Sequence, residues 1–310
     1  MQEDIVRRSI LRVAVRDRDA VAGCWRHGAD AVALDIGGDA GMASREMALP
    51  LLRESIASAG RGGAEVFAII DKAVAYADIE SAAWPGLTGI MLPSPEIPEN
   101  VQDVAAVLDE VERRHGLARG SLQVFLLLGT ASDVWRVREL IAASARVTSV
   151  GLDATSLRRD LGIVPREDFD PFLFAAGRLV IECTAARVQP VGISHPLSVL
   201  PRLLPSAELE RLAQRGRNTG FKGAICPDPS WVEACNRAFT PTVEQIEYYR
   251  EVRRVFAAGI AQDRAAVPLG QQMLDVPVDE RAKKQIALWE RCQRRDAQKA
   301  SAMATATATA

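Results

Sequence analysis

Acidic and hydroxyl side chains stand directly after several apolar runs of this sequence, at Asp35, Thr130, Asp153 and Ser156. Carboxylates in such places can hold a divalent cation or take up a proton beside a substrate carbonyl. Aspartate and threonine also cap helices and bind loop amides at such junctions, so residue type alone leaves both interpretations open. Of the three histidines, only His195 follows a predicted strand, and we expect it to contact substrate.

These residues must be positioned by a repeated pattern of apolar runs and helix-length segments. The runs are continuous rather than alternating, which is typical of parallel strands covered by helices on both faces. Eight such strands with helical segments between them predict an α/β fold, a (β/α)8 TIM barrel of about 250 residues. The predicted strands are 10–15, 31–36, 65–70, 89–94, 122–128, 149–154, 188–194 and 223–226.

An open, doubly wound sheet is the alternative arrangement. That fold usually carries a glycine-rich phosphate-binding loop after its first strand. The corresponding segment here, VRDRDAV, contains no glycine. The barrel is therefore favoured, and its active site is expected at the carboxyl ends of the strands.

The composition excludes several classes of protein. The net charge is -2, which gives no electrostatic basis for binding nucleic acid or an anionic membrane. No run of about 18 apolar residues is present, and the opening segment MQEDIVRRS lacks a signal core, so we expect a cytoplasmic protein. The five cysteines lack metal-site spacing and predict free, buried thiols.

Additional segments follow the eighth predicted strand. We predict a barrel domain over residues 1–240 and a C-terminal arm of helix, hairpin and helix over 241–295. The arm must pack either on its own barrel or on a neighbouring subunit. Residues 296–310 include the low-complexity stretch SAMATATATA, for which we predict disorder.

A set of short motifs runs through the chain in a fixed order. The motifs are RRSILRV with Arg8, HGADAVALDI with Asp35, GLTGIMLPSPEIPENV with Glu96, RVTSVGLDATSLRRDLG, GFKGAICPDPSWVEACNRAFTP and GQQMLDVPVDERAKK with Asp275. In content, order and separation they resemble the HpcH/HpaI aldolase and citrate lyase β-subunit family, over nearly the whole chain.

The resemblance implies a barrel that makes or breaks a carbon–carbon bond next to a carbonyl, commonly in a hydroxyacyl-CoA or a 2-keto acid. In that family a magnesium ion, held by a glutamate after strand five and an aspartate after strand six, stabilises the enolate. The resemblance also implies that an arm aspartate, here Asp275, serves proton transfer in an adjacent subunit. It therefore implies a homo-oligomer, a trimer or a hexamer.

The metal-binding positions depart from the family pattern. Gly129 stands in place of the glutamate and Ser156 in place of the aspartate. Magnesium prefers carboxylate oxygens, and a neutral hydroxyl is a poor replacement. We therefore expect no magnesium at the family position and no other cofactor, the alternative being a relocated site built from Asp153 and Asp71. Two further replaced positions are the strand-three arginine, here Ile69, and a lysine, here Ser94.

Two functions are consistent with these residues. The first is an enzyme of the lyase family that binds an acyl-CoA or a small carboxylated substrate without the usual metal. The second is a non-catalytic subunit that supports or regulates an active paralogue. For the first, the expected catalytic residues are Asp275, Asp35 and Asp153, and the expected substrate-binding residues are Arg8, Glu96, Thr130, Ser156 and His195.

Overall fold

The computed structural model describes residues 5–37, 41–70, 75–164, 169–193 and 204–308. The chain forms two compact units. The barrel unit comprises Met1–Phe239 together with Lys299–Ala310, and the arm unit comprises Thr240–Gln298.

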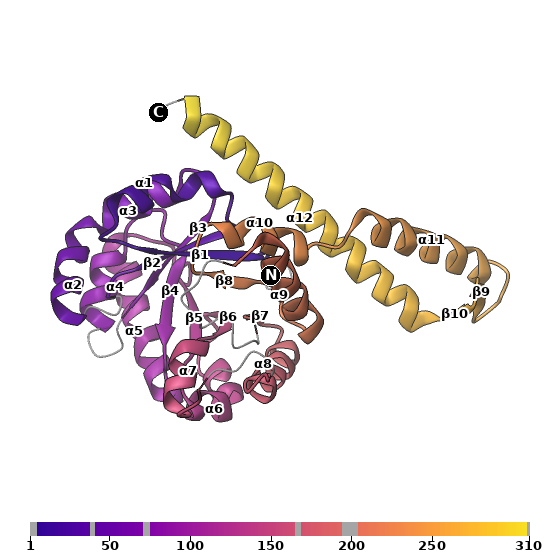
Figure 1. Ribbon diagram of the computed structural model, residues 1–310, viewed down its shortest axis with the longest axis horizontal. Coiled ribbons are helices and arrows are strands. Elements are labelled where there is room, and N and C mark those ends of the chain that lie inside the picture. Colours follow the sequence, from indigo (N-terminus) through magenta and orange to yellow (C-terminus); the bar gives the residue numbers. More distant parts are fainter. Residues whose placement is uncertain (1–4, 38–40, 71–74, 165–168, 194–203, 309–310) are drawn as a thin grey trace. The chain divides into compact units, whose positions relative to one another are not determined.

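Eight parallel strands form the centre of the barrel unit, in the order β7-β6-β5-β4-β3-β2-β1-β8 (Figure 1). Strands that follow each other in the sequence are neighbours, and β1 also pairs with β8. The two ends of this sheet are joined, because the Gly192 amide donates to the Gly223 carbonyl at 2.9 Å. The predicted TIM barrel is confirmed. The strands are β1 (Ser9–Ala14), β2 (Ala31–Asp35), β3 (Glu65–Ile69), β4 (Gly89–Pro93), β5 (Gln123–Leu128), β6 (Val147–Leu152), β7 (Gln189–Val191) and β8 (Ala224–Cys226).

Helices follow the strands and cover the outside of the barrel, as Figure 1 shows. Outward-facing strand residues such as Leu34 and Val124 pack with the apolar faces of these helices into one large core. The helices of this unit are α1 (Arg18–Gly23), η2 (Cys24–His27), α2 (Gly41–Ala48), η4 (Leu49–Leu51), α3 (Leu52–Gly60), α4 (Ala75–Ala82), α5 (Pro98–His115), α6 (Ala131–Ala142), α7 (Ala154–Asp160), α8 (Leu173–Ala186), α9 (Ser206–Thr219) and α10 (Ser230–Ala238).

A second, smaller apolar cluster fills the interior of the barrel. Ile10, Ala33 and Phe67 belong to it and are 0% exposed. Because alternate residues of a strand face the same side, Arg12 shares the inward face of β1 with Ile10. Asp35 shares the inward face of β2 with Ala33 by the same rule. Both charged residues lie toward the carboxyl ends of their strands, where the interior opens.

Glu112 is expected to make a pH-dependent contribution to the stability of the barrel unit. It is buried near the end of α5 and accepts hydrogen bonds from the amides of Gly120 and Leu122, each at 2.7 Å, and from Arg146. Burial alone would raise its pKa, but Arg146 and the two amides outweigh burial and lower the pKa from 4.5 to about 2. Because the pKa of Glu112 is lower in the folded protein than in the unfolded chain, its carboxylate stabilises the fold above the unfolded-state pKa. This contribution to stability is lost as the pH falls from about 4.5 to about 2.

We expect Glu112→Gln to lose this contribution, about 3 kcal/mol in the free energy of unfolding at neutral pH. The difference between variant and wild type should shrink as the pH is lowered through that window. Urea denaturation of both proteins at a series of pH values measures it. A difference that is independent of pH would contradict the assignment.

The arm unit is built from α11 (Val243–Ile260), the antiparallel hairpin β9 (Val267–Leu269) and β10 (Gln272–Leu274), and most of α12 (Val276–Ala308). Its core contains Val252, Phe256, Val267, Leu274 and Ala282. These elements form the helical and hairpin extension that was expected after the barrel. Among the described residues, no helix combines the length and the apolar content that a membrane span requires.

The prediction of a disordered tail over residues 296–310 is wrong as far as Ala308, because α12 continues to that residue. Lys299 is 4% exposed and donates to Asp30 at 2.6 Å and to the Gly28 carbonyl at 2.8 Å. Further along, the Ala306 carbonyl accepts a hydrogen bond from Arg61. Low-complexity composition therefore did not prevent order, since the Lys299 side chain and the Ala306 carbonyl hold this segment within the barrel unit.

Candidate active site at the carboxyl ends of the strands

A cavity of about 130 Å³ opens at the carboxyl ends of the barrel strands. This is the end at which barrel enzymes carry their active sites. Arg12 and Asp153 are the charged residues among those that line it. The lining residues are Arg12, Ile69, Met91, Leu127, Leu152, Asp153, Ala154, Thr155, Gly192, Ile193, Ile225, Pro227 and Trp231.

Arg12 and Asp35 form an ion pair at this mouth. The Nε and Nη2 groups of Arg12 donate to Asp35 Oδ2 at 2.9 and 2.6 Å. The arginine side chain is 47% exposed, whereas that of Asp35 is 8% exposed. Asp35, expected to be catalytic, thus lies behind Arg12 and holds its guanidinium. Arg12 was not among the predicted site residues, although its inward position on β1 follows from strand alternation.

Asp153 is the N-cap of α7. Its carboxylate accepts hydrogen bonds from the Ser156 amide at 3.1 Å and from the Ser156 hydroxyl at 2.7 Å. The two residues are therefore brought together, as both were expected at the site. Asp153 performs the structural role that aspartate has at such junctions and also faces the cavity.

Three replaced family positions converge beside this cap. A Cβ atom added to Gly129 would lie 2.5 Å from Ser94 Oγ and 2.9 Å from Ser156 Cβ. Both distances are shorter than any relaxed carbon contact, so a glutamate at Gly129 requires its neighbours to move. The replaced positions themselves supply two hydroxyls, and the nearest described carboxylates, Asp153 and Asp133, accept hydrogen bonds from the Ser156 hydroxyl and the Gly129 amide. This set fits magnesium poorly, because that ion is usually held through carboxylate oxygens.

Asp133 connects the loops after β4 and β5. It is fully buried and accepts hydrogen bonds from the amides of Glu96 at 2.7 Å and of Gly129 and Thr130 at 2.9 Å. Burial raises the pKa of Asp133, while the donor groups oppose that rise. Thr130 caps α6 by accepting from the Asp133 amide. Thr130, which was expected to bind substrate, thus serves as a helix cap. Glu96, the other expected substrate-binding residue here, has a backbone φ of 62°, in the left-handed region.

Arg8 lies at the opposite end of the barrel. It precedes β1, is 2% exposed, and donates to Asp30 from its amide and from Nε, each at 2.8 Å. The expectation that Arg8 contacts substrate at the mouth therefore fails, because Arg8 is a buried ion-pair residue at the amino ends of the strands. We exclude it from the site.

For three further residues considered for the site, Asp275, His195 and Asp71, a role at the mouth stays a prediction. Asp275 belongs to the arm unit, where its carboxylate accepts from the Val278 amide at 3.1 Å at the start of α12. His195 and Asp71 lie outside the described residues. Within the described ranges, no three His, Cys, Asp or Glu side chains form a cluster able to hold a metal ion. Burial raises the pKa of the Cys226 thiol well above its usual value, which makes it a poor nucleophile.

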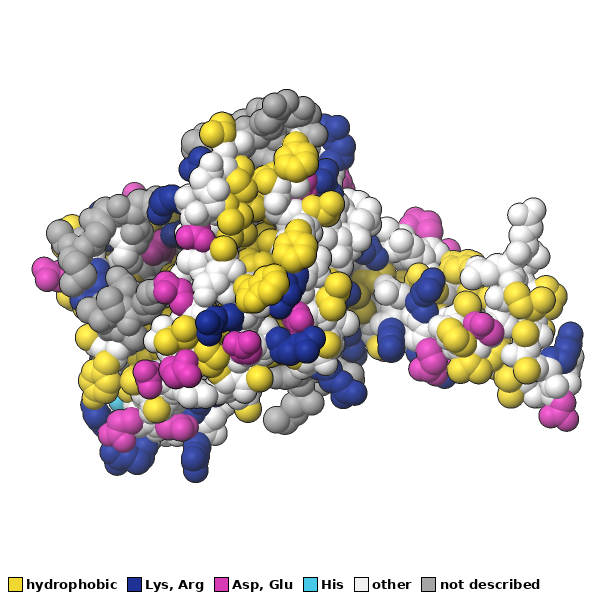
Figure 2. All heavy atoms as spheres, turned by 90° about the horizontal axis from the view of Figure 1, so that it is seen from below, with side chains coloured by type: hydrophobic (Ala, Val, Ile, Leu, Met, Phe, Trp, Pro, Cys, Tyr) yellow, Lys and Arg dark blue, Asp and Glu magenta, His cyan; other side chains and the backbone are white. Residues whose placement is uncertain are grey.

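The outer surface of the barrel unit carries an exposed apolar face. Trp135 of α6 and Leu173, Phe174 and Ile181 of α8 are each more than half exposed. Figure 2 shows the hydrophobic side chains gathered on the side of the barrel that carries these helices. Patches of this kind mark interaction surfaces more often than isolated apolar residues do.

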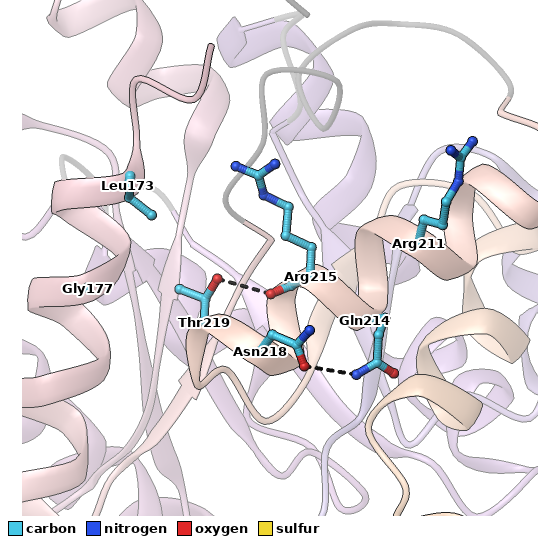
Figure 3. Close-up of a pocket in the computed structure, with 7 residues that line it drawn as sticks. All are labelled: Leu173, Gly177, Arg211, Gln214, Arg215, Asn218 and Thr219. Carbon is cyan, nitrogen blue, oxygen red and sulfur yellow. Dashed lines mark hydrogen bonds between the residues drawn. The ribbon is translucent and has the colours of Figure 1, made fainter. Parts of the chain in front are cut away.

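A shallow hollow of about 680 Å³ adjoins this face, between α8 and α9 (Figure 3). Several polar side chains in it are already engaged, since Gln214 donates to Asn218 at 3.0 Å and Arg215 pairs with Asp170 at 2.9 Å. None of its lining residues belongs to a strand. The cavity at the strand ends is therefore the better candidate for chemistry.

The sequence and the fold match known proteins. A sequence model of the HpcH/HpaI aldolase/citrate lyase family matches residues 8–229. The citrate lyase subunit beta of Leuconostoc mesenteroides subsp. cremoris is 22% identical over 291 residues, which are 93% of this chain and 95% of that protein. Among solved structures, a citrate lyase of Burkholderia xenovorans LB400 has a TM-score of 0.77 at 17% identity, covering 95% of this chain and 96% of that one.

A second solved structure is protein CitE of Mycobacterium tuberculosis, in complex with magnesium, acetoacetate and coenzyme A. It has a TM-score of 0.70 at 21% identity and covers 93% of this chain and 99% of that one. At such identities the solved structures establish a shared fold. The family match spans more than half of the sequence, and the motifs and the barrel agree with it. The chain therefore belongs to the HpcH/HpaI aldolase/citrate lyase family.

Proposed function

We propose that this protein is a citrate lyase β-subunit-like member of the carbon–carbon lyase and aldolase group that binds its substrate without magnesium at the family position. The observation that carries the proposal is the convergence of Ser94, Gly129 and Ser156, where a new Cβ on Gly129 has no room. A metal-free site of this kind must stabilise negative charge on the substrate through fixed donors of the protein. Arg12 is the cationic residue among those that line the cavity.

The proposed ligand is an acyl-CoA or a small keto or hydroxy acid. A cavity of about 130 Å³ is well below the roughly 300–1,000 Å³ of pockets that enclose drug-sized ligands. It therefore suits the acyl or acid end of a ligand, and a coenzyme A moiety would lie outside it. The structurally similar protein CitE was solved with acetoacetate and coenzyme A, together with magnesium, and this supports the proposed class of ligand.

A non-catalytic subunit that supports an active paralogue is the second candidate. It is favoured by the exposed apolar face formed by Trp135, Leu173, Phe174 and Ile181, which suits a protein partner. The five free, buried cysteines suit a reducing compartment, so we propose a cytoplasmic location for either function.

Calorimetry with acetoacetyl-CoA tests the first candidate. We expect the full chain to bind it in the presence of EDTA, and to bind it equally well after excess magnesium is added. Binding that appears only with magnesium would contradict a metal-free site. Binding of neither acetoacetyl-CoA nor acetoacetate under either condition would favour the non-catalytic subunit.

We also propose that the chain forms a homo-trimer or a hexamer through the arm unit. That unit exposes Met273 and Val276, which are 59% and 57% accessible beside the hairpin. Exposed apolar side chains promote aggregation of a monomer, whereas in an oligomer they can be buried between subunits.

Met273→Asp is expected to reduce the mass measured by light scattering from that of the oligomer to that of one chain. Met273→Leu and Asp275→Ala, which leave the apolar surface in place, should keep the oligomer. This substitution is preferable to truncation after Arg264, since truncation also removes the buried Lys299. An unchanged mass for Met273→Asp would contradict assembly through the hairpin.

A further inference from the structure

The exposed apolar face of the barrel unit also carries a positive charge. This α6–α8 face, on the side of the barrel seen in Figure 2, consists of Trp135, Leu173, Phe174 and Ile181. Arg178 lies over the Trp135 ring, with its Cζ atom 4.9 Å from the ring centroid, and donates to the Trp135 carbonyl at 2.6 Å. Among the described residues, no carboxylate pairs with Arg178. The other arginines of the face are each paired with a glutamate, as Arg136–Glu139 and Arg138–Glu182.

The arm unit carries a second exposed apolar patch, and its charge is opposite. The Tyr248 hydroxyl of α11 donates to the Gln272 side chain of the hairpin, so these two elements share one surface. The apolar members of this arm patch, each 43% exposed or more, are Val243, Tyr248, Met273 and Val276. Glu247 and Glu244 lie beside Tyr248 and one turn before it, and both are exposed. Neither forms an ion pair with any cation in the described part of the chain.

We propose that the α6–α8 face of one chain receives the arm patch of a second copy of this chain. The inference rests on the proposed assembly through the arm unit and names the surface that accepts the arm. Docking buries both apolar patches at once and brings the charge of Arg178 toward those of Glu244 and Glu247. Opposite charges across an interface select the partner and its orientation.

The size and the symmetry of this contact fit the proposed homo-trimer. The exposed apolar surface of the two patches comes to roughly 900 Å², so with the charged side chains beside it the contact reaches the about 1,000 Å² expected of a specific interface. Because the patches differ, each chain gives its arm to one neighbour and receives the arm of another. Contacts of this kind can close into rings. Pairing either patch with its own copy would instead bring like charges together.

Mixing two single variants tests the pairing. Phe174→Asp blocks the face and Met273→Asp blocks the arm patch, and each variant alone should have the mass of one chain by light scattering. In an equimolar mixture, the intact arm of the Phe174→Asp chain still fits the intact face of the Met273→Asp chain. We expect the mixture to reach the mass of two chains and no more, because the other two surfaces are both blocked.

Met47→Asp is the matched control, since Met47 lies on α2 outside both patches and is 59% exposed, as Met273 is. It should keep the mass of the wild-type oligomer. A mixture that stays at the mass of one chain would overturn the inference, because the arm and the face would then not bind each other.

The single variants separate this inference from the proposed assembly. If Phe174→Asp keeps the oligomer while Met273→Asp dissociates it, the inference is overturned, assembly through the arm stands, and the α6–α8 face is left for a different protein. A wild-type chain with the mass of a monomer would overturn both.

Discussion

Replacing Asp30 with alanine is expected to lower the free energy of unfolding by about 3–5 kcal/mol, the usual result of removing one partner from a buried ion pair. Asp30 is 0% exposed. It accepts from Arg8 Nε at 2.8 Å, from Arg8 Nη2 at 2.9 Å and from Lys299 Nζ at 2.6 Å. Without it, two buried cations lose the anion that they share.

The electrostatics of Asp30 agree with this expectation. Burial alone would raise its pKa, but the hydrogen bond and charge of Arg8, followed by those of Lys299, outweigh burial and lower it. The carboxylate is therefore charged at neutral pH, and its contribution to stability is present above the unfolded-state pKa and lost as the pH falls through the folded-state pKa. Lys299→Met should cost less than Asp30→Ala, because it removes one cation and leaves the Arg8 pair intact.

Urea denaturation at neutral pH measures both effects. The matched control is Asp103→Ala, an exposed aspartate on α5, for which we expect a change within about 0.5 kcal/mol. A loss for Asp30→Ala as small as that of the control would show that the Arg8, Asp30 and Lys299 cluster does not stabilise the barrel unit.

Restoring carboxylates at the replaced positions is expected to create a divalent-cation site. Gly129→Glu with Ser156→Asp supplies the acidic groups that the family carries after strands five and six. Ser94→Ala must accompany them, since Ser94 Oγ lies 2.5 Å from the position of the new Cβ. The new Cβ would also lie only 2.9 Å from Ser156 Cβ, so α7 has to shift by a few tenths of an ångström.

We expect this triple variant to bind magnesium at least about 10-fold more tightly than wild type, because carboxylates are the preferred protein ligands of that ion. Calorimetric titration of magnesium into both proteins measures the difference. Ser94→Ala alone is the control and should not gain affinity. A triple variant that folds, as judged by its circular dichroism, yet gains no affinity would show that these positions do not form the metal site.

Much of the barrel could be predicted because continuous apolar runs are a strong signal for parallel strands. All eight strands are where they were expected, although β7 is limited to Gln189–Val191 rather than the predicted 188–194. A run buried on both faces does not reveal by itself which residues point inward. Arg12 was overlooked for this reason, and Arg8, four residues earlier, was given a role at the wrong end of the barrel.

Contacts between distant parts of the chain account for the other differences. Lys299 and Asp30 are separated by 269 positions, so nothing local in the last residues indicates that they are anchored. The cap formed by Thr130 and Asp133 could have been predicted from the sequence, since a threonine followed three residues later by an acidic residue is a known capping pattern. The steric convergence on Gly129 was not, because it depends on the loops after three strands.

We infer that the mouth of the barrel binds no magnesium, and a magnesium titration of the wild-type chain tests this. We expect no saturable heat of binding in the micromolar range, since Gly129 and Ser156 supply no carboxylate. Micromolar binding that is lost in Asp153→Ala would contradict it, because the metal site would then have moved to Asp153 instead of having been lost.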